Sequence, residues 1–155
     1  MNADGEIIRM RRYIHKYPET GGNEFNTAKF IETKLKEYAI PSKRIGKTGV
    51  LGVLKGGRCG KTAALRADMD ALPVQEDNKI DYKSKNDGIM HACGHDAHVA
   101  VMLGAARMLA GKKEKLKGTV KFLFQPSEET SDGAESLIRG GALKKPAVDM
   151  ILGIH

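Results

Sequence analysis

The chain has 155 residues, of which 41% are apolar and 29% charged, and this composition is ordinary for a globular domain. Its formal net charge of +7 is scattered along the chain, and with 5% aromatic residues and no Trp a stacking surface for nucleic acid is not expected. No segment approaches the roughly 18 apolar residues that span a bilayer, and the N-terminus has no signal-peptide pattern. We therefore expect a cytoplasmic protein with neither a membrane nor a nucleic acid as partner.

The first third of the chain predicts two helices. Apolar residues recur at helical spacing over residues 6–17 and again over residues 23–38, and a proline follows each run. Glycines at positions 21–22 form the turn between them. His15 falls in the first helix, and we interpret it as structural.

The middle of the chain predicts two strands, an irregular segment and a buried helix. β-favouring runs cover residues 49–54 and 62–66, and the Gly-rich turn between them predicts a hairpin. Residues 72–90 are polar and rich in turn signals. A helix then covers residues 96–111, and its apolar character on most faces predicts burial against a sheet.

The last part of the chain predicts a core strand at residues 120–124, a short helix at 133–138 and a final strand at 150–154. The lysine-rich segment at residues 112–117 is typical of a solvated loop. Helices followed by strands, helix, strand, helix and strand predict an α/β fold, with a layered mixed sheet and flanking helices.

Residues 90–98, with the sequence MHACGHDAH, concentrate metal-binding side chains. Cys93 and His95 are separated by one residue, and in an irregular loop this spacing places both side chains on one side of the backbone. Thiolate and imidazole are ordinary ligands of zinc, nickel and cobalt. Gly94 lets the backbone pass close to an ion. The other cysteine, Cys59, lies in a Gly-rich turn, and the two cysteines predict no disulfide framework.

Further metal-type residues follow three of the predicted strands. Asp68 and Asp70 follow the second strand, Glu128 and Glu129 follow the third, and His155 follows the last. Ligands of open α/β sheets bind at the carboxyl ends of the strands, so we expect these side chains to converge. Neighbouring carboxylates outside a helix can point to different places. One of the two glutamates can then bind metal while the other takes a proton from metal-bound water.

Each segment, when it is taken alone, also fits a structural role without catalysis. The His-x-Cys-x-His group at residues 91–95 fits a structural zinc clip, although such sites usually hold four closely spaced ligands, mostly cysteines. The two aspartates fit turn residues, and the glutamate pair fits the first turn of a helix, where the helix dipole favours acidic groups. His91 and His98 fit either support of a ligand or an ordinary polar role, and we leave both out of the ligand set. The four segments together favour a catalytic metal site.

These residues resemble the aminoacylase and carboxypeptidase-G superfamily of metallohydrolases, whose catalytic domain is zinc-exopeptidase-like. Within it the sequence is similar to the branch of N-acyl-amino-acid amidohydrolases, hippurate hydrolases, auxin-conjugate hydrolases and N-acetyldiaminopimelate deacetylases. The segments that carry the resemblance occur in the family's order, at residues 14–19 (IHKYPE), 65–73 (LRADMDALP), 90–98 (MHACGHDAH), 124–129 (FQPSEE) and 153–155 (GIH).

The resemblance implies a site with two divalent metal ions, which are zinc, manganese, nickel or cobalt. The side chains that correspond to metal ligands are Cys93, His95, Glu129 and His155. Glu128 corresponds to the general base, which takes a proton from metal-activated water and delivers it to the leaving amine. Asp70 corresponds to an acidic residue that orients a ligand, and Asp68 and Asp96 are candidates for the same support.

The resemblance implies a metal-dependent amidohydrolase that acts on small N-acyl or N-acetyl amino acids. Members of the family are considerably longer, with an inserted satellite domain that carries dimerisation and with a further metal-binding His near the C-terminus. We therefore expect residues 1–155 to be the N-terminal part of a truncated catalytic domain, inactive or nearly so alone, from a parent that forms a homo-oligomer. The alternative is a non-catalytic metal-binding or interaction module.

Residues 21–25 depart from the family pattern, since relatives usually carry an aromatic residue and a pair of glutamates there. We interpret this departure as a change at the entry of the second helix that does not affect the chemistry.

Overall fold

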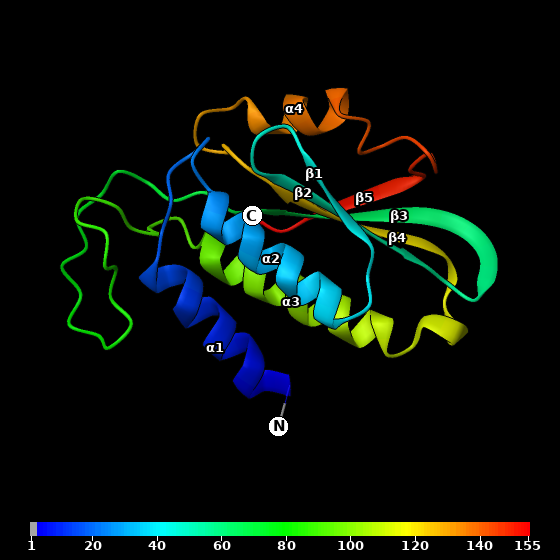
Figure 1. Cartoon of the computed structure of the whole chain (residues 1–155), viewed down its shortest axis with the longest axis horizontal. Helices are drawn as coiled ribbons and strands as arrows, with labels where there is room; N and C mark the ends of the chain where they lie inside the picture. The colour runs from blue at the N-terminus through cyan, green and yellow to red at the C-terminus, as the bar shows by residue number, and fades with distance from the viewer. Residues whose placement is uncertain (1–2) are drawn as a thin grey trace.

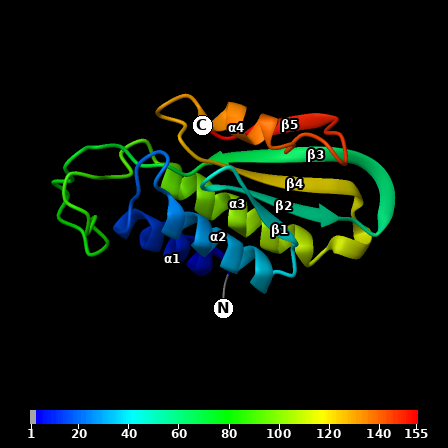
Figure 2. The ribbon, with the colours of Figure 1, turned by 45° about the horizontal axis from the view of Figure 1, so that its top comes forward.

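The computed structural model describes residues 3–155 as a mixed β-sheet with helices on both faces (Figure 1, Figure 2). The helices are α1 (Ala3–Lys16), α2 (Phe25–Glu37), α3 (His95–Ala110), the 3-10 turn η1 (Lys113–Lys115) and α4 (Gly133–Arg139). The strands are β1 (Ser42–Ile45), β2 (Gly49–Lys55), β3 (Arg58–Asp68), β4 (Lys117–Gln125) and β5 (Met150–Gly153). In both views α1, α2 and α3 cover one face of the sheet and α4 lies on the other. The predicted α/β class with flanking helices is confirmed.

The strand order is β1-β2-β4-β3-β5, so β4 lies between β2 and β3. β4 pairs antiparallel with β2 and parallel with β3. The hairpin predicted from the glycine turn between β2 and β3 is therefore wrong. That segment instead passes the end of β4, where the Gly56 N–H donates to the Gly118 carbonyl at 2.8 Å. The apolar half of β4 is buried on both faces, as expected for a central strand of a sheet that carries helices on each face.

β4 divides its side chains between two hydrophobic cores, because successive residues of a strand point to opposite faces. Phe122 and Phe124 pack in the larger core with Leu103 of α3, whereas Leu123 packs in the smaller core with Leu137 of α4. All five side chains are at most 4% exposed. The predicted burial of the α3 segment against the sheet is confirmed.

The predicted elements are confirmed with shifts at their ends. The largest shift is in β3, which runs from Arg58 to Asp68 and not only over residues 62–66, so Asp68 is the last residue of the strand. β1 was not predicted, because this short edge strand is mostly polar and, within residues 3–155, pairs only with β2. The irregular segment before α3 is confirmed, and an isolated antiparallel bridge between Leu72 and Met90 closes its base.

β3, β4 and β5 run parallel, so their carboxyl ends lie at one edge of the sheet. The register pairs Asp68 with Gln125, just before the two glutamates, and Arg66 with Gly153, just before His155. The convergence expected from the strand ends is therefore confirmed, and this edge is where open α/β sheets bind ligands.

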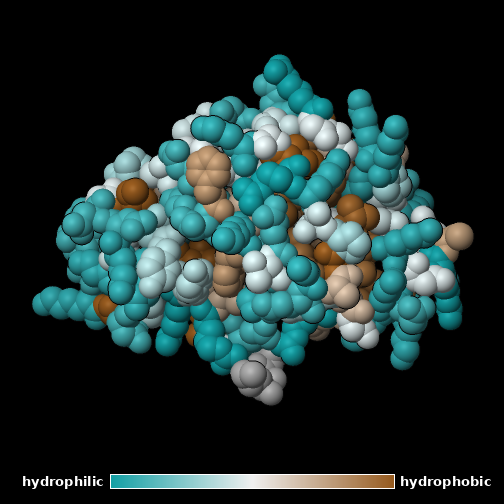
Figure 3. Space-filling model, in the orientation of Figure 1, coloured by the Kyte–Doolittle hydropathy of each residue, from teal (hydrophilic) through white to brown (hydrophobic). Residues whose placement is uncertain are grey.

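The lysine-rich segment around η1 is almost fully exposed, as predicted. Among the described residues no helix is both long and apolar enough to cross a membrane. The face in Figure 3 is largely hydrophilic, with apolar side chains in small separate groups. Both cysteines are free thiols at exposed residues.

Candidate metal centre

His95 lies at the centre of the candidate site. It is the first residue of α3 and follows Gly94, whose φ of +87° favours glycine. The His95 side chain is fully buried. Its Nδ1 donates to the Asp70 carbonyl oxygen at 2.9 Å, so the proton is held on this nitrogen. The other ring nitrogen, Nε2, is buried and has no hydrogen-bond partner within the described chain.

Three carboxylates surround the unpartnered His95 Nε2. Asp68 Oδ1 lies at 3.7 Å, and one oxygen each of Glu128 and Glu129 lies at 3.9 Å. Burial lowers the pKa of His95, but the hydrogen bond to Asp70 and the negative charges around the ring outweigh it, so the pKa is raised. A buried imidazole nitrogen that faces carboxylates without bonding any of them fits a bound cation, because imidazole and carboxylate are both metal ligands.

Asp70 connects His95 with the glutamate turn. Its Oδ1 lies 3.3 Å from His95 Nδ1, and its Oδ2 accepts the backbone N–H of Glu129 at 3.0 Å. Burial raises the pKa of Asp70, but these bonds together hold it below its ordinary value. A carboxylate that orients a candidate ligand in this way is typical of the surroundings of metal-binding histidines. The role predicted for Asp70 is consistent with these contacts.

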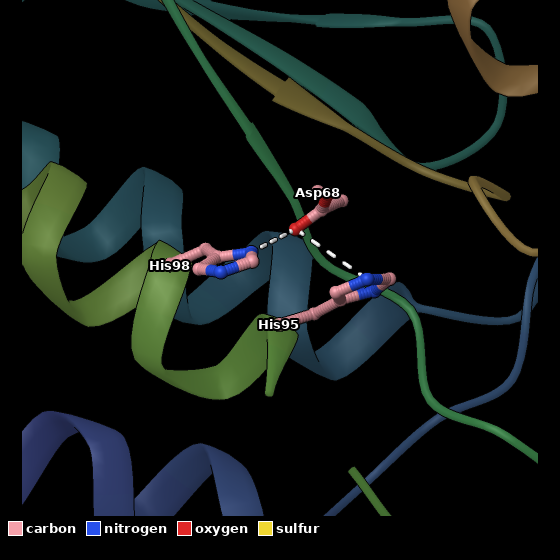
Figure 4. A group of neighbouring side chains, drawn as sticks. All are labelled: Asp68, His95 and His98. Carbon is pink, nitrogen blue, oxygen red and sulfur yellow. Dashed lines mark hydrogen bonds and ion pairs between the residues drawn. The ribbon is translucent and has the colours of Figure 1, made fainter. Parts of the chain in front are cut away.

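Asp68 holds two further histidines at the same edge. Its Oδ1 accepts from His98 Nδ1 at 2.6 Å, and its Oδ2 lies 3.3 Å from His155 Nδ1 and 2.7 Å from Arg66 Nη1. Figure 4 shows Asp68 at the end of β3 between His95 and His98 of α3. Burial raises the pKa of Asp68, but the bond from His98 and the charges of His95 and Arg66 keep it lowered.

His98 was left out of the site on sequence grounds, although a signal for it existed. Residues three apart on a helix lie on one face, so a helix that begins at His95 brings His98 to the same side. Their ring centroids are 5.6 Å apart.

The potential ligand atoms form overlapping groups whose members lie within 4.8 Å of one another, namely Cys93–His95–Glu129, His95–Glu128–His155 and Asp68–His95–His98. Every predicted ligand and the predicted base therefore lie at one site. The pKa of the Cys93 thiol is raised. The largest cause is the partial desolvation of the thiol, and the second is its hydrogen bond with Glu129. Because both glutamates are equally close to His95 Nε2, the division of roles between them stays a prediction.

Asp96 lies beside the centre but its carboxylate is directed toward α1. It accepts from His15 Nδ1 at 2.9 Å and from Arg11 Nε at 3.1 Å, and His15 Nε2 lies 3.2 Å from Glu76 Oε1. Asp96 thus ties the start of α3 to α1, and its predicted support of a ligand stays a prediction.

His91 is 4% exposed with both ring nitrogens unpartnered among the described residues, and burial lowers its pKa to about 4.

Residues 21–25 do more than begin α2, because Glu24 also contacts the turn that precedes the two glutamates, and the interpretation that their departure from the family pattern leaves the chemistry unchanged stays a prediction. Glu24 is fully buried, and its Oε1 accepts the Ser127 N–H at 2.8 Å while its Oε2 accepts the Thr48 hydroxyl at 2.7 Å. Ser127 directly precedes Glu128, so this segment contacts the glutamate turn. No local pattern indicates the contact, because the partners are distant in sequence and are brought together by the sheet.

A thiol, imidazoles and carboxylates gathered at the carboxyl edge of a mixed sheet are typical of a metal-binding α/β domain. The chain belongs to the peptidase family M20/M25/M40, whose model matches residues 64–155. This confirms the resemblance and the fold class.

The chain is similar to curated enzymes and to a solved structure. It is 45% identical to the hippurate hydrolase of Campylobacter jejuni, over 100% of this chain and 40% of that protein. It is also 45% identical to the N-acetyl-L-cysteine deacetylase of Bacillus subtilis, over 97% of this chain and 36% of that protein. The crystal structure of Bacillus subtilis YxeP, described as a dinuclear metal-binding peptidase of the M20 family, matches with a TM-score of 0.94 and 42% identity, over 99% of this chain and 43% of that one. The chain thus spans about two fifths of the length of these relatives.

Proposed function

We propose that this chain forms the metal-binding part of a hydrolase that cleaves the amide bond of small N-acyl amino acids. The observation that carries the proposal is the buried His95 Nε2, unpartnered within the described chain and facing three carboxylates. The names of two relatives, a hippurate hydrolase and an N-acetyl-L-cysteine deacetylase, support the substrate class.

The donor set fits two divalent cations. The ligands that we propose are Cys93, His95, Glu129 and His155. Zinc, manganese, nickel and cobalt all suit such a set, and the dinuclear site named for YxeP supports the number of ions. Bound cations of this kind polarise the amide carbonyl and lower the pKa of water toward about 7.

Glu128 is the general base in this proposal. Its carboxylate takes the proton of the attacking water and delivers it to the nitrogen of the leaving amine, and the products are a carboxylic acid and an amino acid. The place of Glu128 supports this role, since Oε2 lies 3.9 Å from His95 Nε2 and Oε1 lies 4.0 Å from His155 Nδ1. Asp70 holds His95 and Asp68 holds His155, so both rings present a defined nitrogen to the site.

The proposed activity belongs to a chain of the relatives' length. Because this chain spans about two fifths of those relatives, we propose that a further part completes the site and supports a homo-oligomer. The 155 residues alone are expected to bind metal and to hydrolyse substrate slowly or not at all.

The test measures release of amino acid from N-acetyl and N-benzoyl substrates with added manganese, zinc, cobalt or nickel, by this chain and by a chain of the relatives' length that contains it. In the long chain, Glu128→Gln is expected to lower kcat by about 10²–10⁴-fold while metal content is retained. Glu114→Gln, on the exposed turn η1, is the matched control and is expected to keep the full rate.

A Glu128→Gln variant with the full rate would show that the mechanism is wrong. Metal binding without hydrolysis in either chain would favour the alternative, a non-catalytic metal-binding module.

A further inference from the structure

Glu24 is a fully buried carboxylate that none of the roles proposed above uses. Its two oxygens bond to groups far along the chain, the Ser127 N–H at 2.8 Å and the Thr48 hydroxyl at 2.7 Å. Thr48 directly precedes β2, and Ser127 directly precedes Glu128. Glu24 therefore connects the start of α2 with the glutamate turn, through bonds that offset the cost of burying a carboxylate.

The simplest structural role for Glu24 would be to cap the N-terminus of α2, and its contacts contradict this role. Glu24 occupies the N-cap position of α2 without forming a side-chain cap hydrogen bond. Glu19 forms these bonds instead, because its two oxygens accept the N–H groups of Asn26 at 3.1 Å and Thr27 at 2.8 Å. The amides in the first turn of α2 that lack a partner within the helix are thus bonded by Glu19, and Glu24 bonds elsewhere.

The turn that Glu24 holds has an unusual backbone. Ser127 has a φ of +50°, which residues with a side chain rarely adopt. A Cβ added at Gly21 would lie 3.2 Å from Ser127 Cα, so the glycine turn before Glu24 packs directly on this residue. On the other side of Glu128, the N–H of Glu129 donates to Asp70 at 3.0 Å. The amides that flank Glu128 are therefore each bonded to a buried carboxylate.

We propose that Glu24 is a positioning residue that fixes the turn at residues 127–129 and thereby the direction of the Glu128 and Glu129 carboxylates. The catalytic and ligand roles of these glutamates rest on the proposed function, whereas the conformation of the turn does not. Glu24 acts through the Ser127 amide, since its two oxygens bond to Ser127 and Thr48.

The conformation of the turn is tested by amide hydrogen exchange, measured by NMR on the metal-free chain. Glu24→Ala removes the acceptor of the Ser127 N–H, and we expect this amide to exchange about 10–100-fold faster, as the loss of a hydrogen bond to a charged group predicts. Glu24→Gln retains one oxygen for Ser127 and an amide group for Thr48, so its exchange is expected to stay near that of the wild type. Unchanged Ser127 exchange in a folded Glu24→Ala variant would overturn the proposal.

If Glu24→Ala does not fold, Thr48→Val tests the same contacts from the other partner of Glu24. This variant removes the hydroxyl that holds Oε2 of Glu24, so the carboxylate loses one of the two bonds that keep it against Ser127, and we expect faster exchange that is confined to residues 127–129. No change at those residues, with Thr48→Val folded, would equally overturn the proposal.

The consequence for the metal site is tested by titration with cobalt, followed by visible absorption. Glu24→Ala is expected to raise the Kd for cobalt about 10–100-fold, as is usual for residues that orient a ligand, and Glu24→Gln is expected to restore tight binding. Leu54→Ala is the control for lost stability, because Leu54 is buried in β2 and pairs with Val120 at the end of the sheet away from the site.

Equal weakening of cobalt binding by Glu24→Ala and Leu54→Ala would show that Glu24 only stabilises the fold, and the positioning role would be overturned. A wild-type chain that binds no cobalt would contradict the proposed function, while the exchange experiment would still decide whether Glu24 fixes the turn.

Discussion

At the scale of single residues, the candidate site depends on acidic groups that bond to backbone amides and histidines. Asp70 accepts the Glu129 N–H through one oxygen and faces His95 Nδ1 with the other. Oδ2 thus accepts a hydrogen bond, whereas Oδ1 lies beside the His95 ring without a hydrogen-bond partner among the described residues, and the two residues that Asp70 contacts are proposed metal ligands. These hydrogen bonds are present without a bound cation. They therefore orient the proposed ligands in advance of metal binding.

Asp70→Asn is expected to weaken metal binding about 10–100-fold. The variant removes the negative charge beside the His95 ring, and its amide nitrogen, which is a donor, cannot accept the Glu129 N–H. Equilibrium dialysis with zinc or cobalt measures the effect. Glu32→Gln, which breaks a partly exposed ion pair with Arg44 elsewhere, is the control, and unchanged affinity in Asp70→Asn would contradict the prediction.

At the scale of elements, a single carboxylate anchors the irregular segment before α3. Glu76 is 1% exposed, accepts the Ser84 N–H at 2.6 Å and an Asn78 side-chain N–H at 3.1 Å, and lies 3.2 Å from His15 Nε2. Burial raises the pKa of Glu76, but these bonds outweigh it and hold the pKa below its ordinary value of 4.5. Glu76 therefore stabilises the fold as the charged carboxylate.

Glu76→Gln is expected to lower the free energy of unfolding by about 1.5–3 kcal/mol at neutral pH. The folded pKa is lower than the unfolded one, so the stabilisation is fully present above pH 4.5 and is lost as the pH falls through the folded pKa. Urea unfolding at several pH values should show the variant and the wild type converging below pH 4.5. Asp81→Asn, exposed in the same segment, should stay within about 0.5 kcal/mol, and a constant gap at all pH values for Glu76→Gln would refute the assignment.

β4 is the element on which both cores depend. Phe122→Ala is expected to cost about 3–5 kcal/mol, because the fully buried ring fills the larger core and the sheet cannot collapse around the cavity. Guanidinium unfolding measures the loss. Phe25→Ala, whose ring is 48% exposed, should cost far less, and similar losses for both variants would contradict the place of β4 in the core.

At the scale of the whole molecule, β5 leaves an apolar edge. Met150, Ile151 and Leu152 are each more than half exposed, and within the described chain β5 pairs with β3 alone. Edge strands without charges or proline associate readily with other strands. The isolated chain is therefore expected to self-associate as its concentration rises.

Ile151→Lys is expected to reduce this self-association, because a charged side chain on the edge opposes strand pairing. Sedimentation velocity over a range of concentrations measures the effect, with Ile138→Lys as the control for a lysine at another exposed apolar residue. Equal association of the wild type and Ile151→Lys would show that the edge of β5 does not drive it.

The sequence predicts features that depend on neighbouring residues better than contacts between residues that are far apart in the chain. The helices, most strands and the irregular segment followed from local periodicity and turn residues, and the strand-end residues Asp68, Glu128 and His155 were expected at one edge. The pairing of β2 with β3 was mispredicted, because the glycine turn between them looks like a hairpin while burial of β4 decides the strand order. The contact of Glu24 with Ser127 was not predicted, since nothing near Glu24 in the sequence identifies Ser127 as its partner.

By itself the sequence determined the α/β class, the position of each metal-type residue at a strand end or a helix start, and the dense motif around Cys93 and His95. These features depend on residues close together in the chain. Only the tertiary structure decided that β4 is central, that Asp68 holds His98 and His155, and that Glu24 and Asp70 fix the backbone around the two glutamates. Buried polar groups must find hydrogen-bond partners, and which distant group becomes the partner is decided by the packing of the sheet and helices.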